Sequence, residues 1–582
     1  MIQAVKANDG RFKPLVGIKP GLNLVIANRH EQSSERQSRN GAGKSSLIDI
    51  IHYVLGGDLI SETLKSSYLS NWEFSLDMQL DGRQIIASRR VSSNKIILGG
   101  EVQDWNHLAE VGQANIDGGI EISKEEWNKI LGQLCFNLPK EPETQSPTFR
   151  SLIQFFIRNG QEAYNSPFET FKQEKVWQKQ VYNTYLLDLG WEYARELSQK
   201  KEQEKKTADL IKGIKEVNKE SATQGKLEAE RIILEGKIGR LEANLRNFRV
   251  LPQYEITQKE ADNITVEISN INQSLFHNNQ LLLMYETDND NIPAIDGKLF
   301  DRLYASATVE IPEMVKKRYE DAAFFHQEVI QNRKRFLKSE IDRLTSLILK
   351  SKSDLEQLDA KRAELLNILA THKALDDYNR LQNELSLLKT SLGEILYKLN
   401  HLKEYEERKS RITIELENLK ESADKDYQER KTNREEAIRQ FNLYSEVLHE
   451  APGQLIIDLN NNGYKFDIQI QGGRSDGRNK IMKTFCYDLT LAYLWSKKKV
   501  SPRILIHDSL MFDGVDSRQI GKAIELVHQE AVTHGYRYIM TLNSDDLHKV
   551  TTEYDLQKLN IQDYIRLELD DTDTGGLFGC KF

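Results

Sequence analysis

The chain has 582 residues, of which 29% are charged and 39% hydrophobic, and its formal net charge is −8 at pH 7. This charge excludes a uniformly basic surface, so any contact with DNA must be local. The sequence opens without a basic-then-apolar leader and no apolar run reaches membrane-spanning length, so we expect a cytoplasmic protein with no membrane contact. Three scattered cysteines, none in a C-x-x-C pair, argue against a disulfide framework and a zinc site.

The first functional motif follows the apolar run Leu22 to Ile26 and reads SRNGAGKSSLIDII from Ser38 to Ile51. Strand, glycine-rich loop and apolar helix in this order predict a phosphate-binding P-loop, although Ser38 replaces the first glycine of the usual motif. Lys44 would reach the β- and γ-phosphates, and the Ser45 hydroxyl would bind magnesium. We therefore predict an ATP and Mg²⁺ site. Its P-loop residues are Asn40, Gly41, Ala42, Gly43, Lys44, Ser45 and Ser46.

From about Leu187 to about Leu448 the composition is typical of long exposed helices, rich in Lys, Glu, Leu, Gln and Asn. Three apolar runs keep the alternating steps of a heptad seam, which predicts helices paired as a coiled coil. The first run is Leu227, Leu234, Ile238, Leu241, Leu245 and Phe248; the second is Leu337, Ile341, Leu344, Ile348, Leu355, Leu358, Leu365 and Leu369; the third is Tyr378, Leu381, Leu385, Leu388, Leu392, Ile395, Leu399 and Leu402.

Two breaks interrupt these seams, at Pro252 and between Leu369 and Tyr378. In an antiparallel hairpin they would lie side by side, about 90 Å from the base at 1.5 Å per residue, and we interpret them as an elbow. The turn-forming segment TDNDNIPAIDG places the apex within residues 286–312.

The predicted organisation is therefore a split head on a hairpin. Residues 1–190 form its N-terminal half, 191–285 the ascending arm, 286–312 the apex, 313–448 the descending arm and 449–582 the C-terminal half. Neither half carries a complete nucleotide site, so the arm must bring them together into one head of about 320 residues, ample for a buried core.

The second half of the site lies in the C-terminal segment. Residues Arg503 to Asp508 form a short apolar strand that ends in a carboxylate. Such an aspartate holds magnesium through its water shell in P-loop proteins, which makes Asp508 the predicted Walker B residue.

This order of parts resembles the SMC proteins and their double-strand-break-repair and RecN-like relatives within the ABC ATPases. The resemblance implies an α/β ABC-type ATPase head, with a mixed sheet and a P-loop, plus a long antiparallel α-helical coiled coil with an elbow. More narrowly, NGAGKSSLIDIIHYVLGG, KTFCYDLTLAYLW and ILIHDSLMFDGVDSRQIG are similar to the SMC-like ATPase of bacterial three-component ABC defence systems, including the Lamassu type. That likeness implies a homodimer through the heads, a middle-component subunit, an effector that is commonly a nuclease, and double-stranded DNA of phage or plasmid origin.

The resemblance also implies roles for residues outside the P-loop. Gln161 or Asn159 would be the Q-loop amide that senses the γ-phosphate and contacts magnesium, with a plain surface-loop amide as the alternative. Ser475, Gly477 and Asn479 stand where the signature motif contacts the nucleotide of the opposite head, and Asp516 stands at the D-loop. Ordinary helix caps are the alternative for both segments.

Two departures from the ABC pattern bear on hydrolysis. Ser509 takes the place of the glutamate that orients the attacking water, and Asn543 follows the strand after which a switch histidine is expected. Because general acid–base assistance is worth about 10²–10⁴ in rate, we expect slow turnover. His507 and Asp513 are the nearest substitutes, although His507 is also consistent with a satisfied histidine in the sheet. The predicted catalytic set is Asp508, Ser509, His507 and Gln161, and Asn543 joins the nucleotide-binding set.

Two lysine clusters are candidates for contact with the DNA backbone. They are Lys200, Lys201, Lys205 and Lys206 at the coil base, and Lys497, Lys498 and Lys499 on the head. Solvated helix faces are the alternative interpretation.

The leading hypothesis is an SMC-like ABC ATPase that binds Mg-ATP between paired heads and senses or holds foreign DNA to license an effector. One alternative is an ATP-gated scaffold with little hydrolysis, and another is a chromosomal repair or recombination ATPase. No nuclease constellation is visible in the sequence.

Overall fold

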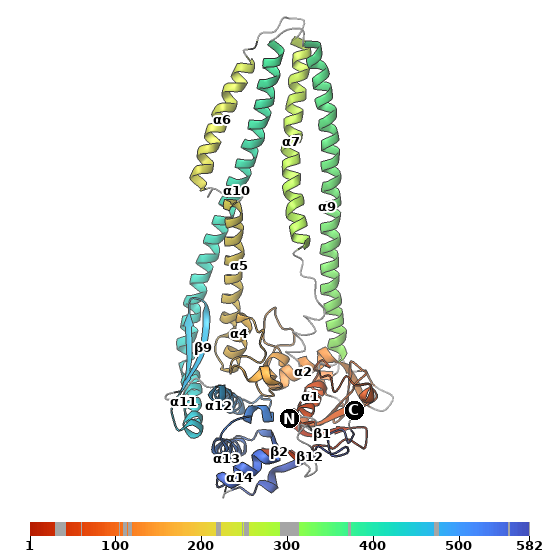
Figure 1. Ribbon diagram of the computed structural model, residues 1–582, viewed down its shortest axis with the longest axis vertical. Helices are drawn as coiled ribbons and strands as arrows, with labels where there is room; N and C mark the ends of the chain where they lie inside the picture. Colours follow the sequence, from red (N-terminus) through yellow and green to blue (C-terminus); the bar gives the residue numbers. More distant parts are fainter. Residues whose placement is uncertain are drawn as a thin grey trace. The chain divides into compact units, whose positions relative to one another are not determined.

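The computed structural model describes residues 1–28, 42–59, 61–103, 105–108, 113–114, 119–216, 223–246, 248, 255–290, 313–369, 374–470, 477–556 and 559–580. The chain divides into two compact units (Figure 1). The head unit comprises Met1–Gln199, Ile295–Phe325 and Asn418–Phe582, and the arm unit comprises Lys200–Ala294 and His326–Glu417. The head unit thus combines segments from both ends of the sequence.

A four-stranded parallel sheet joins these two ends. Its order is β10 (Ile504–His507), β11 (Arg537–Asn543), β2 (Gly21–Asn28) and β12 (Ile565–Asp570), and all three pairings are parallel. Parallel strands covered on both faces read as continuous apolar runs. That is why β2 and β10 are buried along almost their whole length. Because the four carboxyl ends share one edge, residues that follow β2, β10 and β11 meet there.

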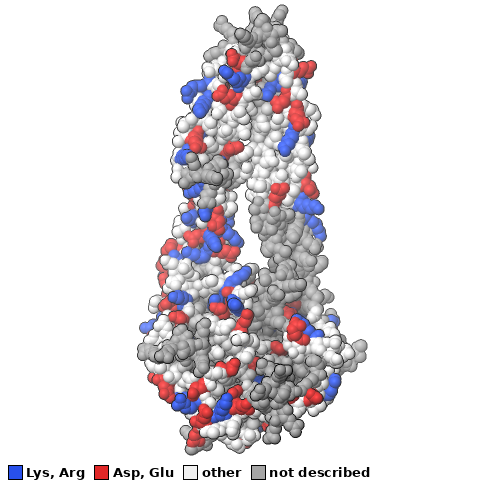
Figure 2. All heavy atoms as spheres, in the orientation of Figure 1, with Lys and Arg blue, Asp and Glu red and all other residues white. Residues whose placement is uncertain are grey.

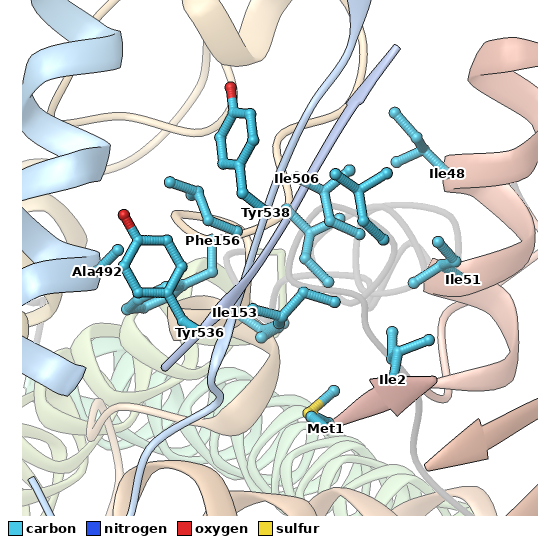
Figure 3. Close-up of a cluster of buried hydrophobic side chains, with 14 of the residues drawn as sticks. Met1, Ile2, Ile48, Ile51, Ile153, Phe156, Ala492, Ile506, Tyr536 and Tyr538 are labelled. Carbon is cyan, nitrogen blue, oxygen red and sulfur yellow. The ribbon is translucent and has the colours of Figure 1, made fainter. Parts of the chain in front are cut away.

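Helices from both halves of the sequence cover this sheet. They are α1 (Lys44–Val54), α12 (Gly477–Ser496), α13 (Ser517–His534) and α14 (Ser544–Glu553). Figure 3 shows one part of the core, in which Ile48 and Ile51 of α1 lie near Ile506 of β10. Tyr536, Tyr538, Ile153 and Phe156 belong to the same buried cluster. Burial of these apolar side chains holds the two halves of the head together.

A second sheet, which is antiparallel, belongs to the N-terminal half. Its order is β1 (Ile2–Ala7), β3 (Glu73–Leu80), β4 (Arg83–Arg90), β5 (Lys95–Gly100), β7 (Ile120–Ser123) and β6 (Gln113–Ala114). Inward-facing residues alternate along β3, as expected where one face packs on a core. Asp81 and Gly82 join β3 to β4 with positive φ angles of 49° and 77°, which is the Asp-Gly chemistry of a tight hairpin. The β-structure predicted for the head is thus distributed over separate parallel and antiparallel sheets.

Shorter elements complete the head unit. Ser123 caps α2 (Lys124–Phe136) by accepting a hydrogen bond from the backbone amide of Glu126, and Thr148 caps α3 (Phe149–Ile153) in the same way. The remaining elements are η2 (Ser67–Leu69), η3 (Asn106–Leu108), η4 (Gln161–Tyr164), α4 (Val176–Leu186), β8 (Gly453–Asn460), β9 (Gly463–Ile470), η5 (Ser509–Phe512) and η6 (Ile561–Tyr564).

Long helices carry the chain through the arm unit. They are α5 (Trp191–Glu216), α6 (Gln224–Arg246), α7 (Glu255–Asp290), α9 (Glu313–Leu369) and α10 (Ala374–Glu429), and α11 (Lys431–His449) returns to the head unit. All predicted seam residues whose side chains are described are buried or half-buried, and Leu402 is only 1% exposed. By contrast Leu387, off the seam on the same helix, is 70% exposed. The coiled-coil character of this region is therefore confirmed.

The path of the arm differs from the predicted hairpin. The carboxylate of Glu242 in α6 lies 2.8 Å from the Nζ atom of Lys389, and Leu227 clusters with Leu402. As residue numbers increase along α6, the numbers of the contacting residues in α10 decrease. These two helices are therefore antiparallel (Figure 1).

Helix α7 also packs along α10, in the opposite sense to α6. Asp262 accepts hydrogen bonds from Tyr378 and Gln382, and Phe276 meets Tyr397 at a ring distance of 6.1 Å. These numbers rise together, so α7 and α10 are parallel and the chain reverses between α6 and α7. The single ascending arm predicted for 191–285 is therefore wrong.

The reversal lies between Arg246, the last residue of α6, and Glu255, the first residue of α7. The break at Pro252 was interpreted as one side of an elbow in a continuing arm, but the chain changes direction across this interval. Pro252 itself and residues 291–312 of the predicted apex lie outside the described residues, whereas residues 286–290 are still part of α7. Among the helices that the structure describes, none combines the length and the apolar composition needed to cross a membrane.

Candidate nucleotide site

The P-loop sequence leads into α1 at the carboxyl edge of the parallel sheet. Asn40 and Gly41 lie outside the described residues, and Ala42 and Gly43 are the first described residues before the helix. Gly43 has φ 95°, and a Cβ atom there would lie 2.6 Å from the Cβ of Leu577, whose amide donates to the Ala42 carbonyl at 3.0 Å. Only glycine fits this position, because the backbone is left-handed and the space is filled.

Ser45 and Asp508 come together at this edge. Ser45 lies exposed in the first turn of α1, and its Oγ donates to Oδ2 of Asp508 at 2.7 Å. The other carboxylate oxygen accepts from Thr541 Oγ1 at 2.8 Å and from the Ser509 amide at 2.6 Å. Thr541 and Ser509 thus fix the orientation of Asp508, and its Oδ2 faces Ser45 of α1.

These two oxygens suit the cation that the motif predicts. A hydroxyl and a carboxylate are hard oxygen ligands of the kind that Mg²⁺ binds alongside substrate phosphates and water. The Ser45 hydroxyl and Asp508 Oδ2 therefore form a donor set that fits magnesium.

Lys44 lies beside this pair and is held by Asn543. Its Nζ donates to Oδ1 of Asn543 at 2.7 Å, and Lys44 is only 5% exposed. Asn543 ends β11, the strand after which the ABC pattern places a switch histidine. The residue in contact with Lys44 at this position is thus an amide rather than a histidine. Ser46, which follows in α1, is half-buried.

The predicted Q-loop segment lies against α1. Asn159 Nδ2 donates to Oδ1 of Asp49, which sits one helical turn after Ser45. Burial raises the pKa of Asp49, hydrogen bonds from Ser61 and Asn159 oppose the rise, and the charge of Asp508 adds to it. Asp49, Asn159 and Gln161 line one cavity of about 490 Å³. Of the two candidate amides, Asn159 is the one bonded to the P-loop helix, while Gln161 is exposed at the start of η4.

His507 lies in the core rather than at the predicted catalytic position. It is fully buried, with Nδ1 2.8 Å from Tyr538 Oη and Nε2 3.1 Å from Asp488 Oδ2. Burial lowers the pKa of His507, although the Asp488 carboxylate opposes this. Asp508 directly follows β10 and is bonded to Ser45 of α1, whereas the preceding His507 is enclosed in the core, as the alternation of neighbouring side chains predicts. The satisfied-histidine alternative thus fits, and the catalytic assignment of His507 does not.

The Asp488 carboxylate that contacts His507 also forms a buried ion pair with Arg158, which was not predicted from the sequence. Arg158 and Asp488 are both fully buried and paired through two bonds of 2.6 and 2.8 Å. Arg158 also donates to the carbonyls of Pro167 and Glu169 at 2.7 and 2.8 Å, which fixes the loop after the Q-loop segment. A lone aspartate within the apolar stretch KTFCYDLTLAYLW was the available signal, since such a charge needs a buried partner.

The remaining predicted catalytic neighbours are Ser509 and Asp513. Ser509 is half-buried and its hydroxyl lies 3.2 Å from Asp508 Oδ1, so it adds a further contact to the Asp508 carboxylate. Asp513 is exposed at the end of η5. Neither Ser509 nor Asp513 is thus placed as a general base beside Ser45.

The predicted inter-head residues are placed only in part. Ser475 lies outside the described residues, and Gly477 and Asn479 fall in the first turn of α12. Asp516 is the N-cap of α13 and accepts from the Arg518 amide at 3.0 Å, which is the ordinary capping alternative. Contacts of these residues with an opposite head stay a prediction.

Most of the candidate DNA-contacting lysines are paired with carboxylates. Lys200 pairs with Glu415, Lys201 with Glu204, Lys206 with Glu202, Lys497 with Glu436 and Lys498 with Asp188. Lys205 and Lys499 are exposed. Figure 2 shows basic and acidic side chains interspersed on the visible face. This arrangement is typical of a solvated surface, and DNA binding stays a prediction.

Comparison with known proteins gives three kinds of likeness. Residues 442–582 match the family model described as "Uncharacterised protein conserved in bacteria (DUF2326)". The uncharacterized protein YydD of Bacillus subtilis (strain 168) is 21% identical over 97% of this chain and 96% of its own length.

Two solved structures are also similar. One is the Smc head domain with a coiled coil and joint from Pyrococcus yayanosii, at 11% identity and a TM-score of 0.36 over 95% of this chain and 93% of that one. The other is the Smc head domain with an extended coiled coil bound to the C-terminal domain of ScpA from Pyrococcus furiosus, at 10% identity and a TM-score of 0.31 over 94% and 90%. Scores of this size do not establish a shared fold, so the geometry above carries the functional argument.

Proposed function

We propose that this protein is an SMC-like ABC ATPase that binds Mg-ATP at the carboxyl edge of its parallel sheet. The observation that carries the proposal is the 2.7 Å bond between Ser45 of the P-loop helix and Asp508 of the Walker B strand. The P-loop motif and the apolar strand that ends in Asp508 are each weaker signals alone. Their meeting at one edge of one sheet is what a P-loop nucleotide site requires.

The roles of the residues follow from their chemistry. Amides of the P-loop and of the α1 N-terminus would hold the phosphates, and Lys44 would reach the β- and γ-phosphates. Ser45 would bind the magnesium directly, and Asp508, held by Thr541 and Ser509, would bind it through water. Bound magnesium would neutralise phosphate charge.

Hydrolysis at this site is expected to be slow. Asp508 is followed by Ser509, and His507 is enclosed in the core. A transition state without a general base forfeits about 10²–10⁴ in rate. Two heads would therefore stay paired around two Mg-ATP for a long time, through Gly477, Asn479 and Asp516. In the finer proposal, this homodimer holds foreign double-stranded DNA and licenses a middle subunit and an effector in bacterial defence.

Equilibrium ATP binding tests the core of the proposal. We expect the wild type to bind Mg-ATP and Lys44→Ala to lose binding by at least about 10-fold, because a charge-assisted bond to phosphate is lost. Lys6→Ala is the matched control, since this exposed lysine pairs with Asp77 in the antiparallel sheet. Equal ATP affinity in wild type and Lys44→Ala would reject the nucleotide site.

A second candidate is an ATP-gated scaffold that hardly hydrolyses, and the same serine at 509 favours it. Phosphate release measured with and without duplex DNA and partner subunits separates the two. Strong stimulation that is lost in Asp508→Asn supports the ATPase, and unchanged slow release supports the scaffold. Cleavage of DNA by the isolated chain would contradict both.

A further inference from the structure

Asn543 occupies a helix-capping position but does not cap the helix. It is the residue directly before α14, and its side chain makes no capping hydrogen bond. An asparagine at this position usually accepts a hydrogen bond from a backbone amide of the first turn, which stabilises the helix. Helix α14 forgoes this bond, so the side chain of Asn543 is committed elsewhere.

Both ends of the Asn543 amide are engaged by charged groups. Oδ1 accepts from Lys44 Nζ at 2.7 Å, and Nδ2 donates to Asp546 Oδ2 at 2.9 Å. An ammonium can only donate and an ionised carboxylate can only accept, so these two neighbours leave the amide a single orientation. Asp546 therefore helps to hold Asn543 with its side-chain oxygen toward Lys44.

Asp546 is itself diverted from an ordinary role. It is the third residue of α14, the position from which an acidic side chain commonly reaches back to the backbone amide of the cap residue. Here it takes the side-chain amide of Asn543 instead. Asn543 and Asp546 at the start of α14 thus form a chain of hydrogen bonds to Lys44 instead of capping the helix.

We propose that Asp546 is a positioning residue that holds Asn543 on Lys44 as a gate for the nucleotide. This inference rests on the proposed function. The Asn543 oxygen takes one donor of the ammonium that the terminal phosphates would contact. An incoming triphosphate competes with that oxygen for Lys44, and the charged phosphate is favoured because it is a stronger acceptor than a neutral amide.

The exchange has a structural consequence. The Lys44–Asn543 bond is a tie between α1 and the β11–α14 junction, two segments that are 499 positions apart in the sequence. ATP breaks this tie while Asp546 keeps its hold on Asn543. The start of helix α14 therefore loses its contact with α1 when Lys44 binds a phosphate.

Titration of Mg-ATP against full-length variants tests the gate. Asn543→Ala changes no charge and removes one acceptor that competes with phosphate for Lys44, so we expect ATP to bind about 3- to 10-fold more tightly, the equivalent of one hydrogen bond. A merely structural role for Asn543 would leave the affinity unchanged or weaken it.

Loss of a negative charge near the phosphates would also tighten binding, so Asp546 needs two variants. Asp546→Asn removes the charge but keeps an oxygen that accepts from Asn543, whereas Asp546→Ala removes both. We expect the gain in ATP affinity to be larger for Asp546→Ala. In the Asn543→Ala background that excess should vanish, because Asp546 acts through Asn543. Glu553→Ala, at the exposed far end of α14, is the control.

Thermal melting and circular dichroism of each variant confirm that it is folded. An Asn543→Ala protein that binds ATP no more tightly than wild type overturns the gate. An Asp546→Ala excess that persists without Asn543 overturns the positioning role. If wild type binds no ATP, the proposed function fails as well, and that result is distinct from wild type binding ATP with unchanged variants.

Discussion

The Ser45 hydroxyl donates a 2.7 Å hydrogen bond to the Asp508 carboxylate, although 463 positions separate the two residues along the chain. Both lie at the carboxyl edge of the parallel sheet, where β2 of one half pairs with β11 and β12 of the other. This pair joins the two halves of the head.

The first prediction concerns this pair in the absence of nucleotide. Ser45→Ala and Asp508→Ala should be coupled in a double-mutant cycle by about 1.5–3 kcal/mol of unfolding free energy, the range for a hydrogen bond to a charged group. Urea unfolding of the four proteins measures it. Strict additivity would mean that the bond does not form in solution.

The second prediction concerns the buried ion pair of Arg158 and Asp488. Asp488→Asn should lower the unfolding free energy by about 3–5 kcal/mol, because it leaves a fully buried guanidinium without its counter-charge. Replacing both residues, as Arg158→Met with Asp488→Leu, should recover part of the loss. Guanidinium chloride titration measures both.

An exposed pair on α10 provides the comparison for that experiment. The side chains of Glu421 and Lys425 are exposed to solvent, with Lys425 Nζ 2.8 Å from Glu421 Oε1. Glu421→Gln should therefore leave the unfolding midpoint unchanged. A midpoint for Asp488→Asn that matches Glu421→Gln would contradict the buried pair.

The third prediction is a pH dependence of stability through Glu174. Burial raises the pKa of Glu174 to about 7 from 4.5, although hydrogen bonds from the amide and hydroxyl of Thr170 oppose this. An acid whose folded pKa is raised binds its proton more tightly in the folded state, so stability falls as pH rises from about 4.5 to 7.

Glu174→Gln removes this titration and keeps the oxygen that accepts from Thr170. Relative to this variant, wild type should lose up to about 3 kcal/mol between pH 4.5 and 7 and change no further above. Denaturant titrations at a series of pH values measure the difference. A difference independent of pH would show that Glu174 stays ionised.

The fourth prediction tests the seam of the arm. Leu402 is 1% exposed and packs with Ile211, Leu227 and Ile395. Leu402→Ala should destabilise the arm by about 2–4 kcal/mol, since it removes a buried side chain. Leu387→Ala on the same helix is the control, because Leu387 is 70% exposed. Thermal loss of helical circular dichroism at equal temperatures in both variants would contradict the assigned seam.

The site could be predicted where local pattern and chemistry coincide. A glycine-rich loop between an apolar strand and a helix has few other uses, and an apolar strand ending in Asp508 completes it. Strand alternation alone would also have placed His507 opposite Asp508, an argument that the catalytic assignment of His507 overlooked. The hold of Thr541 on Asp508 and the pairing of Arg158 with Asp488 join residues far apart in sequence, so no local pattern contains them.

The arm shows a similar division. Heptad spacing predicts which side of each helix is buried, and Leu344 and Leu402 are nearly inaccessible as expected. The same spacing does not specify which helix packs against the seam or in which direction it runs, because parallel and antiparallel neighbours can bury the same seam residues. The reversal between α6 and α7, which sets α7 along α10, therefore could not be read from Leu and Ile positions.

The most direct measurement for the nucleotide site is equilibrium ATP binding with magnesium and with EDTA, made on wild type, Ser45→Ala and Asp508→Asn. The two substitutions lie in opposite halves of the sequence, and both side chains are assigned to one magnesium ion. We predict that magnesium strengthens ATP binding in wild type, and that this gain is lost in both variants. A full magnesium effect retained in Asp508→Asn would contradict a single site built from both halves.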